Sequence, residues 1–135
     1  MKYLFLLSVF FLLTSVSCKM DPPYFSYSNV TVDIIEKNIP ENGTVNQPVI
    51  VSGICSAPNG CWSGLRFVFK KREDFTYDFY ALGSYESYGM CPDVVVTQDT
   101  LISFTPEVAG EYVITTRITS DFFERDTLVV TLPGK

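Results

Sequence analysis

The chain has 135 residues, with 10 Lys and Arg against 15 Asp and Glu, a formal net charge of −5 and no His. This length accommodates one ordinary domain and excludes an elaborate multidomain enzyme. The acidic balance argues against a nucleic-acid-binding protein, which needs a basic face to neutralise phosphates. The absence of His removes the commonest general base and metal ligand.

Residues 1–17 have the composition of a cleaved export signal. Lys2 supplies positive charge, residues 3–13 are apolar except for Ser8, and small residues then lead to Cys18. This order of segments is typical of a secretory signal peptide. A transmembrane helix needs about 20 apolar residues, more than this stretch provides.

The end of this signal has more than one interpretation. Ser15 and Ser17 would suit an ordinary signal peptidase that cuts before Cys18, which would then be a disulfide cysteine. The same place resembles a bacterial lipobox, in which Cys18 is the lipidated first residue of the mature chain. Ser15 stands where the usual lipobox has Leu, a departure tolerated in Bacteroidota lipoproteins. We expect lipidation, because residues 19–23 read as a tether and not as folded structure. The whole linker, residues 18–28, contains three aromatic residues. Two or more acyl chains, at about 0.8 kcal/mol per buried CH₂, would anchor the protein stably.

From residue 29 onward the apolar residues alternate with a period of two, which indicates β-strands. Turn-forming Gly, Pro and Asn residues separate them. Seven or eight short strands with this spacing predict an all-β fold, an antiparallel Ig-like β-sandwich over residues 29–135. An up-and-down barrel fits the same composition and stays open as an alternative. The strands are expected at residues 30–34, 48–54, 65–70, 75–82, 94–97, 101–105, 112–118 and 128–132.

Four cysteines follow the signal, in an oxidising compartment where disulfides form. If Cys18 carries lipid, three remain and one of them is unpaired. We favour a disulfide between Cys61 and Cys91, because Cys61 opens a predicted strand and Cys91 closes the hairpin excursion that follows. A Cys55–Cys91 pair is the competitor. Zinc is disfavoured, because the Cys-x₂₋₄-Cys spacing is absent and no His completes a site.

Two stretches of the predicted domain resemble bacterial Ig-like domains. Residues 45–53 resemble their second strand, and residues 104–112 resemble their turn into a late strand, with Tyr112 placed like a tyrosine corner. Across residues 59–130, the two cysteines, this F-x-P-x-x-A-G-x-Y-like turn and the alternating last strand resemble small Bacteroidota lipoproteins with Ig-like domains. The resemblance implies an envelope-anchored module and, by analogy of fold alone, a role in glycan handling or surface assembly.

Two groups of carboxylates are candidates for chemistry. Glu73, Asp74 and Asp78 could imitate a catalytic pair, but they fall in a predicted tight turn and at an outward strand position, where charges keep an edge soluble. Glycosidase carboxylates must also flank a cleft. The three carboxylates of residues 121–126 lack the spacing of a calcium loop, so we interpret them as a solvated acidic turn. No catalytic residue, metal or cofactor is therefore expected.

Aromatic side chains form the candidate binding patch. Tyrosine rings on a rigid edge can stack on sugars or anchor a protein partner, because they add contact area at a low entropic cost. If alternate tyrosines fill the core instead, such a patch is lost. The candidate patch comprises Tyr77, Tyr80, Tyr85, Tyr88 and Phe122.

Two short segments suggest modification. Asp99-Thr100-Leu101 and Asp126-Thr127-Leu128 resemble the Asp-Ser/Thr-apolar acceptor of Bacteroidota periplasmic O-glycosylation. Thr100 and Thr127 are therefore candidate glycosylation sites.

These observations together predict a lipoprotein of the cell envelope, held on the outer membrane through its lipid. We expect a non-enzymatic binding or adhesion module for a glycan or a protein partner, without nucleic acid. A structural or accessory subunit of an envelope assembly is the alternative. A small hydrolase, or a redox protein that uses an unpaired Cys55 thiol, is the least favoured function.

Overall fold

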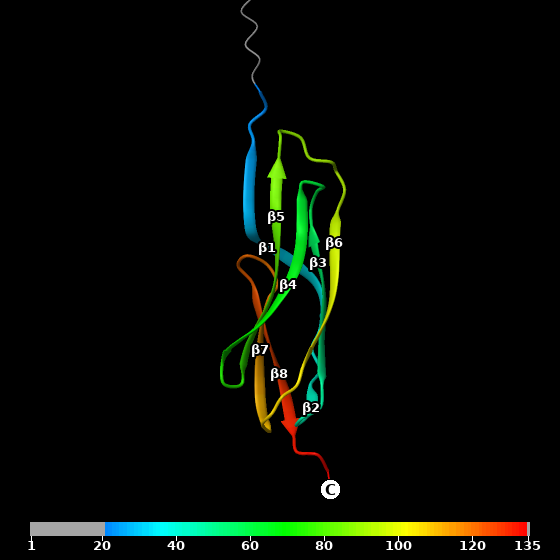
Figure 1. Cartoon of the computed structure of the whole chain (residues 1–135), viewed down its shortest axis with the longest axis vertical. Helices are drawn as coiled ribbons and strands as arrows, with labels where there is room; N and C mark the ends of the chain where they lie inside the picture. Colours follow the sequence, from blue (N-terminus) through cyan, green and yellow to red (C-terminus); the bar gives the residue numbers. More distant parts are fainter. Residues whose placement is uncertain (1–20, 135) are drawn as a thin grey trace, which may run out of the picture.

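The computed structural model describes residues 21–134, so the predicted signal peptide (1–17) and Cys18 lie outside the described residues. The described part is all-β, as predicted, and runs from top to bottom of Figure 1. Within residues 21–134, no helix has the length and apolar character to cross a membrane. The strands are β1 (Phe25–Asn38), β2 (Asn42–Thr44), β3 (Val49–Ala57), β4 (Trp62–Glu73), β5 (Thr76–Ser87), β6 (Val96–Phe104), β7 (Gly110–Arg117) and β8 (Phe123–Thr131).

The alternating sequence pattern explains which side of each strand is buried. Successive side chains of a strand point to opposite faces. In β3, every second residue from Val49 to Ala57 is buried, and β7 repeats this pattern through Tyr112, Ile114 and Thr116. These strands therefore each contribute one apolar face to the core.

The strands form a mixed sheet, so the purely antiparallel arrangement expected from the sequence is wrong. Neighbours follow the order β2-β8-β7-β5-β1-β3-β6, and β4 pairs with β5 as well. Two pairings are parallel, β2 with β8 and β5 with β7. β7 gains access to β5 because β1 covers only the later part of that edge: β1 pairs with residues 81–87, and β7 pairs with Thr76–Phe79.

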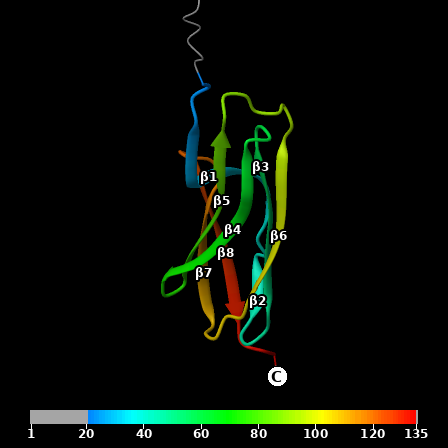
Figure 2. The same ribbon diagram turned by 45° about the horizontal axis from the view of Figure 1, so that its top comes forward.

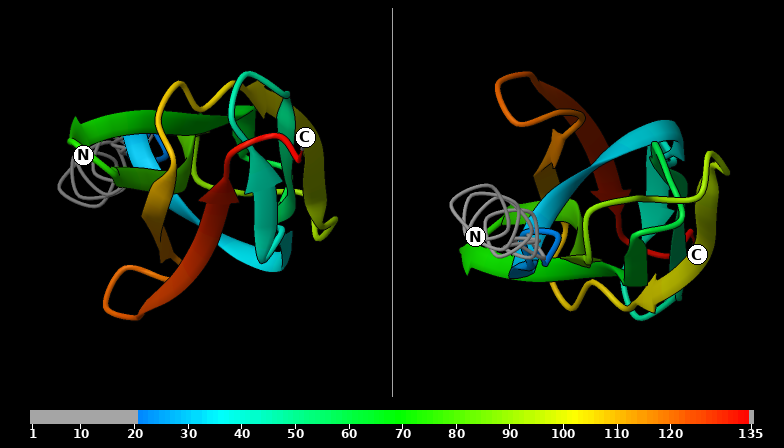
Figure 3. Two further views of the ribbon diagram at one scale, coloured as in Figure 1. Left: turned by 90° about the horizontal axis from the view of Figure 1, so that it is seen from below. Right: turned by 90° about the horizontal axis from the view of Figure 1, so that it is seen from above.

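The sheet curls because β1 changes partner along its length. It pairs with β5 as far as Val32 and with β3 from Asp33 onward. β3 and β6 are thereby turned to face β4 and β5, as the rotated view in Figure 2 and the end-on views in Figure 3 show. The facing strands are in close contact, since a Cβ on Gly53 of β3 would lie 3.1 Å from the rings of both Phe67 and Phe79.

The core consists of two clusters of buried residues. The larger one lies between the facing strands and includes Val51, Cys55, Phe79 and Ile114, all fully buried. The smaller one is built around Tyr112 of β7 and the inward side of β8. Half-buried aromatic rings, among them Tyr77 and Phe104, contact both clusters and join them into a continuous interior.

Residues 25–28 belong to β1, whereas the sequence placed them in the linker 18–28. Phe25 lies opposite Ser87 and Tyr27 lies opposite Tyr85. The linker prediction fails here because the aromatic residues have cross-strand partners on β5, and such pairs stabilise a strand. A bulge follows at Asn29, whose φ of 58° is a conformation that Asn tolerates better than most residues.

Of the acidic stretch near the last strand, only Asp121 lies in an exposed turn as the sequence predicted. Glu124 and Asp126 lie in β8 and turn toward Lys37 of β1. Lys37 Nζ lies 3.0 Å from Glu124 Oε2 and also contacts Asp126. Burial by itself lowers the pKa of Lys37, but the hydrogen bonds and charges of Asp126 and Glu124 outweigh it and raise the pKa above 10.5.

The substitution Lys37→Met tests this cluster. At neutral pH it leaves two partly buried carboxylates without their cation, so we expect the free energy of unfolding to fall by about 1–3 kcal/mol. Because the pKa of Lys37 is raised in the folded state, its contribution is complete below pH 10.5 and is lost at higher pH. Urea unfolding should therefore show a difference between wild type and variant that shrinks above that pH. Lys70→Met, at an exposed position, is the matched control.

Candidate functional site

The favoured disulfide is present in the structure. Cys61 and Cys91 are bonded, with their Cα atoms 5.2 Å apart, so the Cys55–Cys91 alternative is wrong. The bond joins the start of β4 to the segment after β5. Cys55 is unpaired and fully buried in the larger core cluster, and burial raises the pKa of its thiol. A reactive thiol needs exposure and a lowered pKa, so Cys55 has the character of a core residue.

The predicted aromatic patch is divided among different places. Tyr77 is half-buried and stacks on Phe69 with ring centroids 4.9 Å apart, so it belongs to the aromatic wall of the core. Tyr80 lies on the opposite side of β5, where it lines a shallow depression of about 250 Å³ together with Arg117 and Phe123. Phe122 is 54% exposed in the turn between β7 and β8.

Tyr85 and Tyr88 lie at the end of the domain where the described chain begins. Tyr85 faces Tyr27 on one neighbouring strand and Trp62 on the other, which gives a row of three rings across β1, β5 and β4. The hydroxyl of Tyr85 lies 3.4 Å from Cys91 Sγ, so this row adjoins the disulfide. Tyr88 is 67% exposed and packs on Tyr24, with ring centroids 4.9 Å apart.

Tyr24 and Tyr27 were missed as members of an aromatic surface. The sequence signal was the presence of three aromatic residues in the predicted linker, because a flexible linker has no need of them. The pairing of residues 25–27 with β5 decides where this segment lies, and cross-strand register between segments about 60 residues apart is set by the fold and not by local pattern.

A pocket of about 500 Å³ opens between the turn that joins β4 to β5 and the loop that joins β6 to β7. We call it the hairpin pocket. The two connections that flank it lie in the lower part of Figure 1, away from the end where the N-terminal segment leaves the domain. A volume of this size is typical of small-ligand sites. The pocket is lined by Lys71, Asp74, Phe75, Tyr77, Thr105, Pro106, Glu107, Val108 and Tyr112.

One wall of the hairpin pocket is the β4–β5 turn, whose conformation is unusual. Phe75 has a φ of 63°, in the left-handed region, which costs a residue other than Gly or Asn about 1–2 kcal/mol. The carbonyl of Phe75 accepts a hydrogen bond of 2.7 Å from the N–H of Val113, and its ring packs edge-on against Tyr112. A Cβ on Gly110 would lie only 2.9 Å from that ring, so Gly110 leaves it room. These contacts offset the strain and fix the turn on β7.

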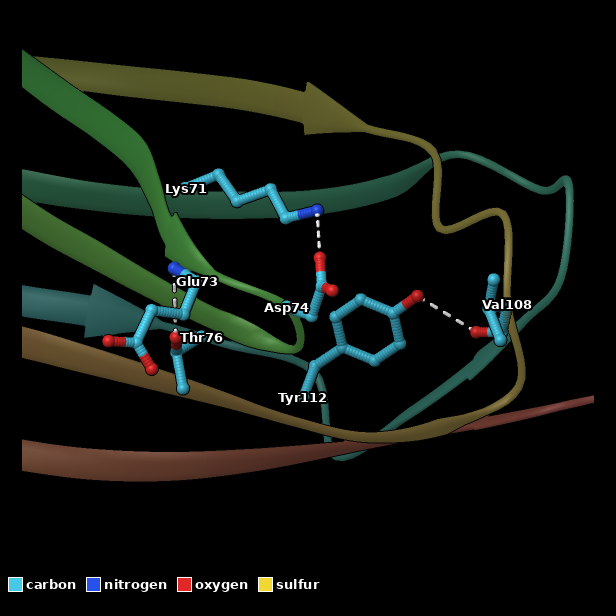
Figure 4. Close-up of polar contacts among 6 residues, drawn as sticks. All are labelled: Lys71, Glu73, Asp74, Thr76, Val108 and Tyr112. Atoms are coloured by element: carbon cyan, nitrogen blue, oxygen red, sulfur yellow. Dashed lines mark hydrogen bonds and ion pairs between the residues drawn. The ribbon is translucent and has the colours of Figure 1, made fainter.

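The other wall is the loop of residues 105–108. The hydroxyl of Tyr112 donates a hydrogen bond of 2.8 Å to the carbonyl oxygen of Val108, as Figure 4 shows. Pro106 is buried, and its carbonyl accepts a hydrogen bond of 2.9 Å from the N–H of Asn46. The tyrosine-corner contact expected from the sequence is thus present, and it holds the wall at a fixed distance from β7.

The rim of the hairpin pocket is charged and its floor is aromatic. Lys71 Nζ lies 2.8 Å from Asp74 Oδ1 in Figure 4, and this hydrogen bond raises the pKa of Lys71 and lowers that of Asp74. Glu107 is exposed on the opposite rim. Burial raises the pKa of the Tyr77 hydroxyl, which therefore stays neutral. The carboxylates of the pocket can accept hydrogen bonds from a ligand, and the aromatic rings between them can pack against its apolar face.

Two of the three candidate carboxylates of this hairpin, Asp74 and Asp78, are paired with cations. Asp74 is held ionised by Lys71, whereas a general acid needs a raised pKa. Asp78 accepts a hydrogen bond of 3.0 Å from Nε of Arg72, and Nη2 of the same guanidinium also contacts it. Among residues 21–134, His, Cys, Asp and Glu form no group of three or more that could hold a metal ion.

The two candidate glycosylation sites lie on strands. Thr100 is half-buried in β6, opposite Gly53 of β3. Thr127 is exposed in β8. Their modification stays a prediction.

No family model, curated protein or solved structure matches this chain.

The substitution Tyr112→Phe removes the hydroxyl that holds the loop wall. The ring and its packing are kept, so we expect the free energy of unfolding to fall by about 0.5–1.5 kcal/mol. Because Val108 loses its partner, amide hydrogen exchange in residues 105–108 should also become faster. Tyr80→Phe, for which no such contact exists in the described structure, is the control and should leave exchange in this loop unchanged. Equal exchange rates in Tyr112→Phe and wild type would contradict this role.

Proposed function

We propose that this chain is a lipoprotein of the cell envelope, acylated at Cys18 and held on the outer membrane, whose Ig-like domain is a non-enzymatic binding module. The observation that carries the proposal is the hairpin pocket, a preformed hollow with fixed walls at a distance from the N-terminal end. A tether at Cys18 would leave this pocket facing away from the anchored end, open to a partner. The Ig-like assignment is supported by the facing strands and the Tyr112 corner, although β5 and β7 run parallel where an Ig domain has antiparallel strands.

Binding is favoured over catalysis by the chemistry of the pocket. Its best-placed carboxylate, Asp74, forms an ion pair with Lys71. This ion pair lowers the pKa of Asp74 and keeps the carboxylate ionised. Both walls are fixed by hydrogen bonds that β7 donates, from the N–H of Val113 to Phe75 and from the hydroxyl of Tyr112 to Val108. A rigid pocket with a polar rim suits recognition, because little conformational entropy is lost when a ligand binds.

A glycan is the ligand class that fits the lining best. Sugar rings present C–H faces that pack on aromatic side chains, and hydroxyl groups that donate to carboxylates. The hairpin pocket places the half-buried rings of Phe75 and Tyr77 beside the carboxylates of Asp74 and Glu107. A protein segment is the competing ligand and is an outcome of the test below.

A structural or accessory subunit is the second candidate, and the free edge of β6 favours it. Among the described strands, β6 is paired only with β3, so one edge is left open for another strand. Leu101 on β6 and Ile50 on β3 are exposed to 77% and 53%. Strand addition by a larger assembly would cover this edge.

Binding of defined hexasaccharides by calorimetry tests the pocket. Neutral α- and β-linked hexamers of glucose, mannose, xylose and N-acetylglucosamine are the probes. We expect at least one to bind, and Asp74→Asn with Glu107→Gln to weaken its binding by about tenfold or more, because hydrogen bonds to charged groups are lost. Glu73→Gln is the matched control, an exposed carboxylate in the same hairpin that does not line the pocket.

Two results would overturn the glycan assignment. One is that no probe binds and that, in cells, a photoreactive residue placed at position 107 cross-links the chain to another protein. The other is binding that the paired substitution leaves unchanged.

Intact mass of the chain purified from membranes tests the tether. We expect a mature chain that begins at Cys18 and carries acyl chains, with a mass increase of two hydrogens on reduction from the Cys61–Cys91 bond. A chain that begins at Cys18 without acylation, or one that keeps residues 1–17, would remove the lipoprotein assignment.

A further inference from the structure

We infer that the end of the domain where the described chain begins is a membrane-contacting surface, which lies against the polar–apolar interface of the bilayer. The inference rests on the proposed tether at Cys18 and goes beyond it, since a tether alone would let the domain tumble above the membrane. We call this surface the apolar tip. Its members are Tyr24, Tyr27, Tyr88, Met90, Val94 and Val95, each more than half exposed.

The apolar tip is formed by segments that are distant in the sequence and meet at one end of the domain. Figure 1 shows the start of β1, the end of β5 and the β5–β6 connection together at the top. The disulfide between Cys61 and Cys91 ties this connection to the start of β4. Gly60 lets the same connection approach closely, since a Cβ there would lie 3.0 Å from side-chain atoms of both Pro92 and Val94. The tip is therefore a constrained surface, in which exposed apolar groups are held in place.

The position of the tether limits what the tip can face. Five residues lie between Cys18 and Tyr24, and the six Cα–Cα steps that join the two can span no more than about 22 Å when fully extended. Pro22 packs on Gly89 of the tip, where a Cβ would lie 2.6 Å from the proline ring. The chain therefore leaves the domain at the tip itself. A lipid at Cys18 brings the tip to the bilayer at a high effective concentration, so that weak contacts suffice.

The composition of the tip suits an interface. Tyrosine is enriched where a bilayer meets water, because its ring is apolar and its hydroxyl is polar. The hydroxyls of Tyr24 and Tyr88 both donate to Glu86 Oε1 at 3.0 Å, which satisfies them at the edge of the surface. The row of Tyr27, Tyr85 and Trp62 continues this aromatic character along the sheet.

Charge decides between a bilayer and a second copy of the chain. Asp21, Glu86 and Asp93 are exposed around the tip. Two tips placed face to face would oppose these carboxylates, whereas a zwitterionic headgroup layer offers choline groups to them. We therefore expect contact with phosphatidylcholine, and no preference for anionic lipids, which attract basic segments.

Trp62 supplies the readout, because it is the single Trp of the chain and lies in the aromatic row. The mature chain, residues 18–135, is coupled through Cys18 to phosphatidylcholine vesicles that contain a maleimide lipid. Cys55 is buried and the other two cysteines are bonded, so the reaction is confined to Cys18. We expect a spin label on the lipid headgroup to quench Trp62 fluorescence more strongly than a label in the middle of the acyl chain.

Two variants decide whether the tip causes this quenching. Tyr88→Ser with Met90→Ser removes exposed apolar groups of the tip, and most of the quenching should be lost. Leu101→Ser with Leu132→Ser is the matched control, which removes exposed apolar groups elsewhere on the domain. Its Trp62 fluorescence should be quenched as strongly as that of the wild type.

Other results would overturn the inference without touching the tether. Trp62 fluorescence that the headgroup label leaves unchanged, or quenching that is equal in both variants, shows that the tip does not lie on the bilayer. A dimer of the uncoupled chain in sedimentation velocity that Tyr88→Ser with Met90→Ser dissociates would assign the tip to a second copy. Conversely, an intact mass without lipid on Cys18 removes the proposed tether. The quenching of Trp62 in the coupled chain then still tests whether the apolar tip contacts a bilayer.

Discussion

The change of partner within β1 is the constraint on which the rest of the structure depends. One continuous strand pairs with β5 up to Val32 and with β3 from Asp33, so the sheet must turn upon itself. This turn brings β3 against β4 and β5 and encloses the larger core cluster. It also leaves the early part of β5 free for β7, which produces the parallel pairing.

The same arrangement separates the two surfaces that we propose to be functional. The first half of β1 holds its aromatic residues beside the end of β5 and thereby builds the apolar tip. The pairing of β5 with β7 fixes the β4–β5 turn against Tyr112 and Gly110 and thereby builds one wall of the hairpin pocket. Strained backbone at Phe75 persists in that wall because the contacts around it outweigh its cost.

Charged groups contribute mainly by being paired. Lys37 pairs with two carboxylates of β8, Lys71 pairs with Asp74, and Arg72 pairs with Asp78. Lys71 and Asp74 are largely exposed, so their ion pair contributes little to stability. It sets the charge and shape of the pocket rim instead.

The sequence by itself determined the all-β class, the approximate strands and the position of Tyr112, because these follow from period-two alternation and a local turn motif. It favoured the Cys61–Cys91 pairing from the place of the two cysteines beside predicted strands, and the structure excluded the Cys55–Cys91 alternative. Only the tertiary structure decided strand order, direction and register. The predicted patch was divided for this reason: neighbouring tyrosines of one strand point to opposite faces, and Tyr77 and Tyr88 lie near opposite ends of β5. The partners of Tyr85, of Lys37 and of Phe75 all come from distant segments. Pattern along a chain reports which face of a strand is apolar, whereas the identity of the facing strand depends on how the whole sheet curls.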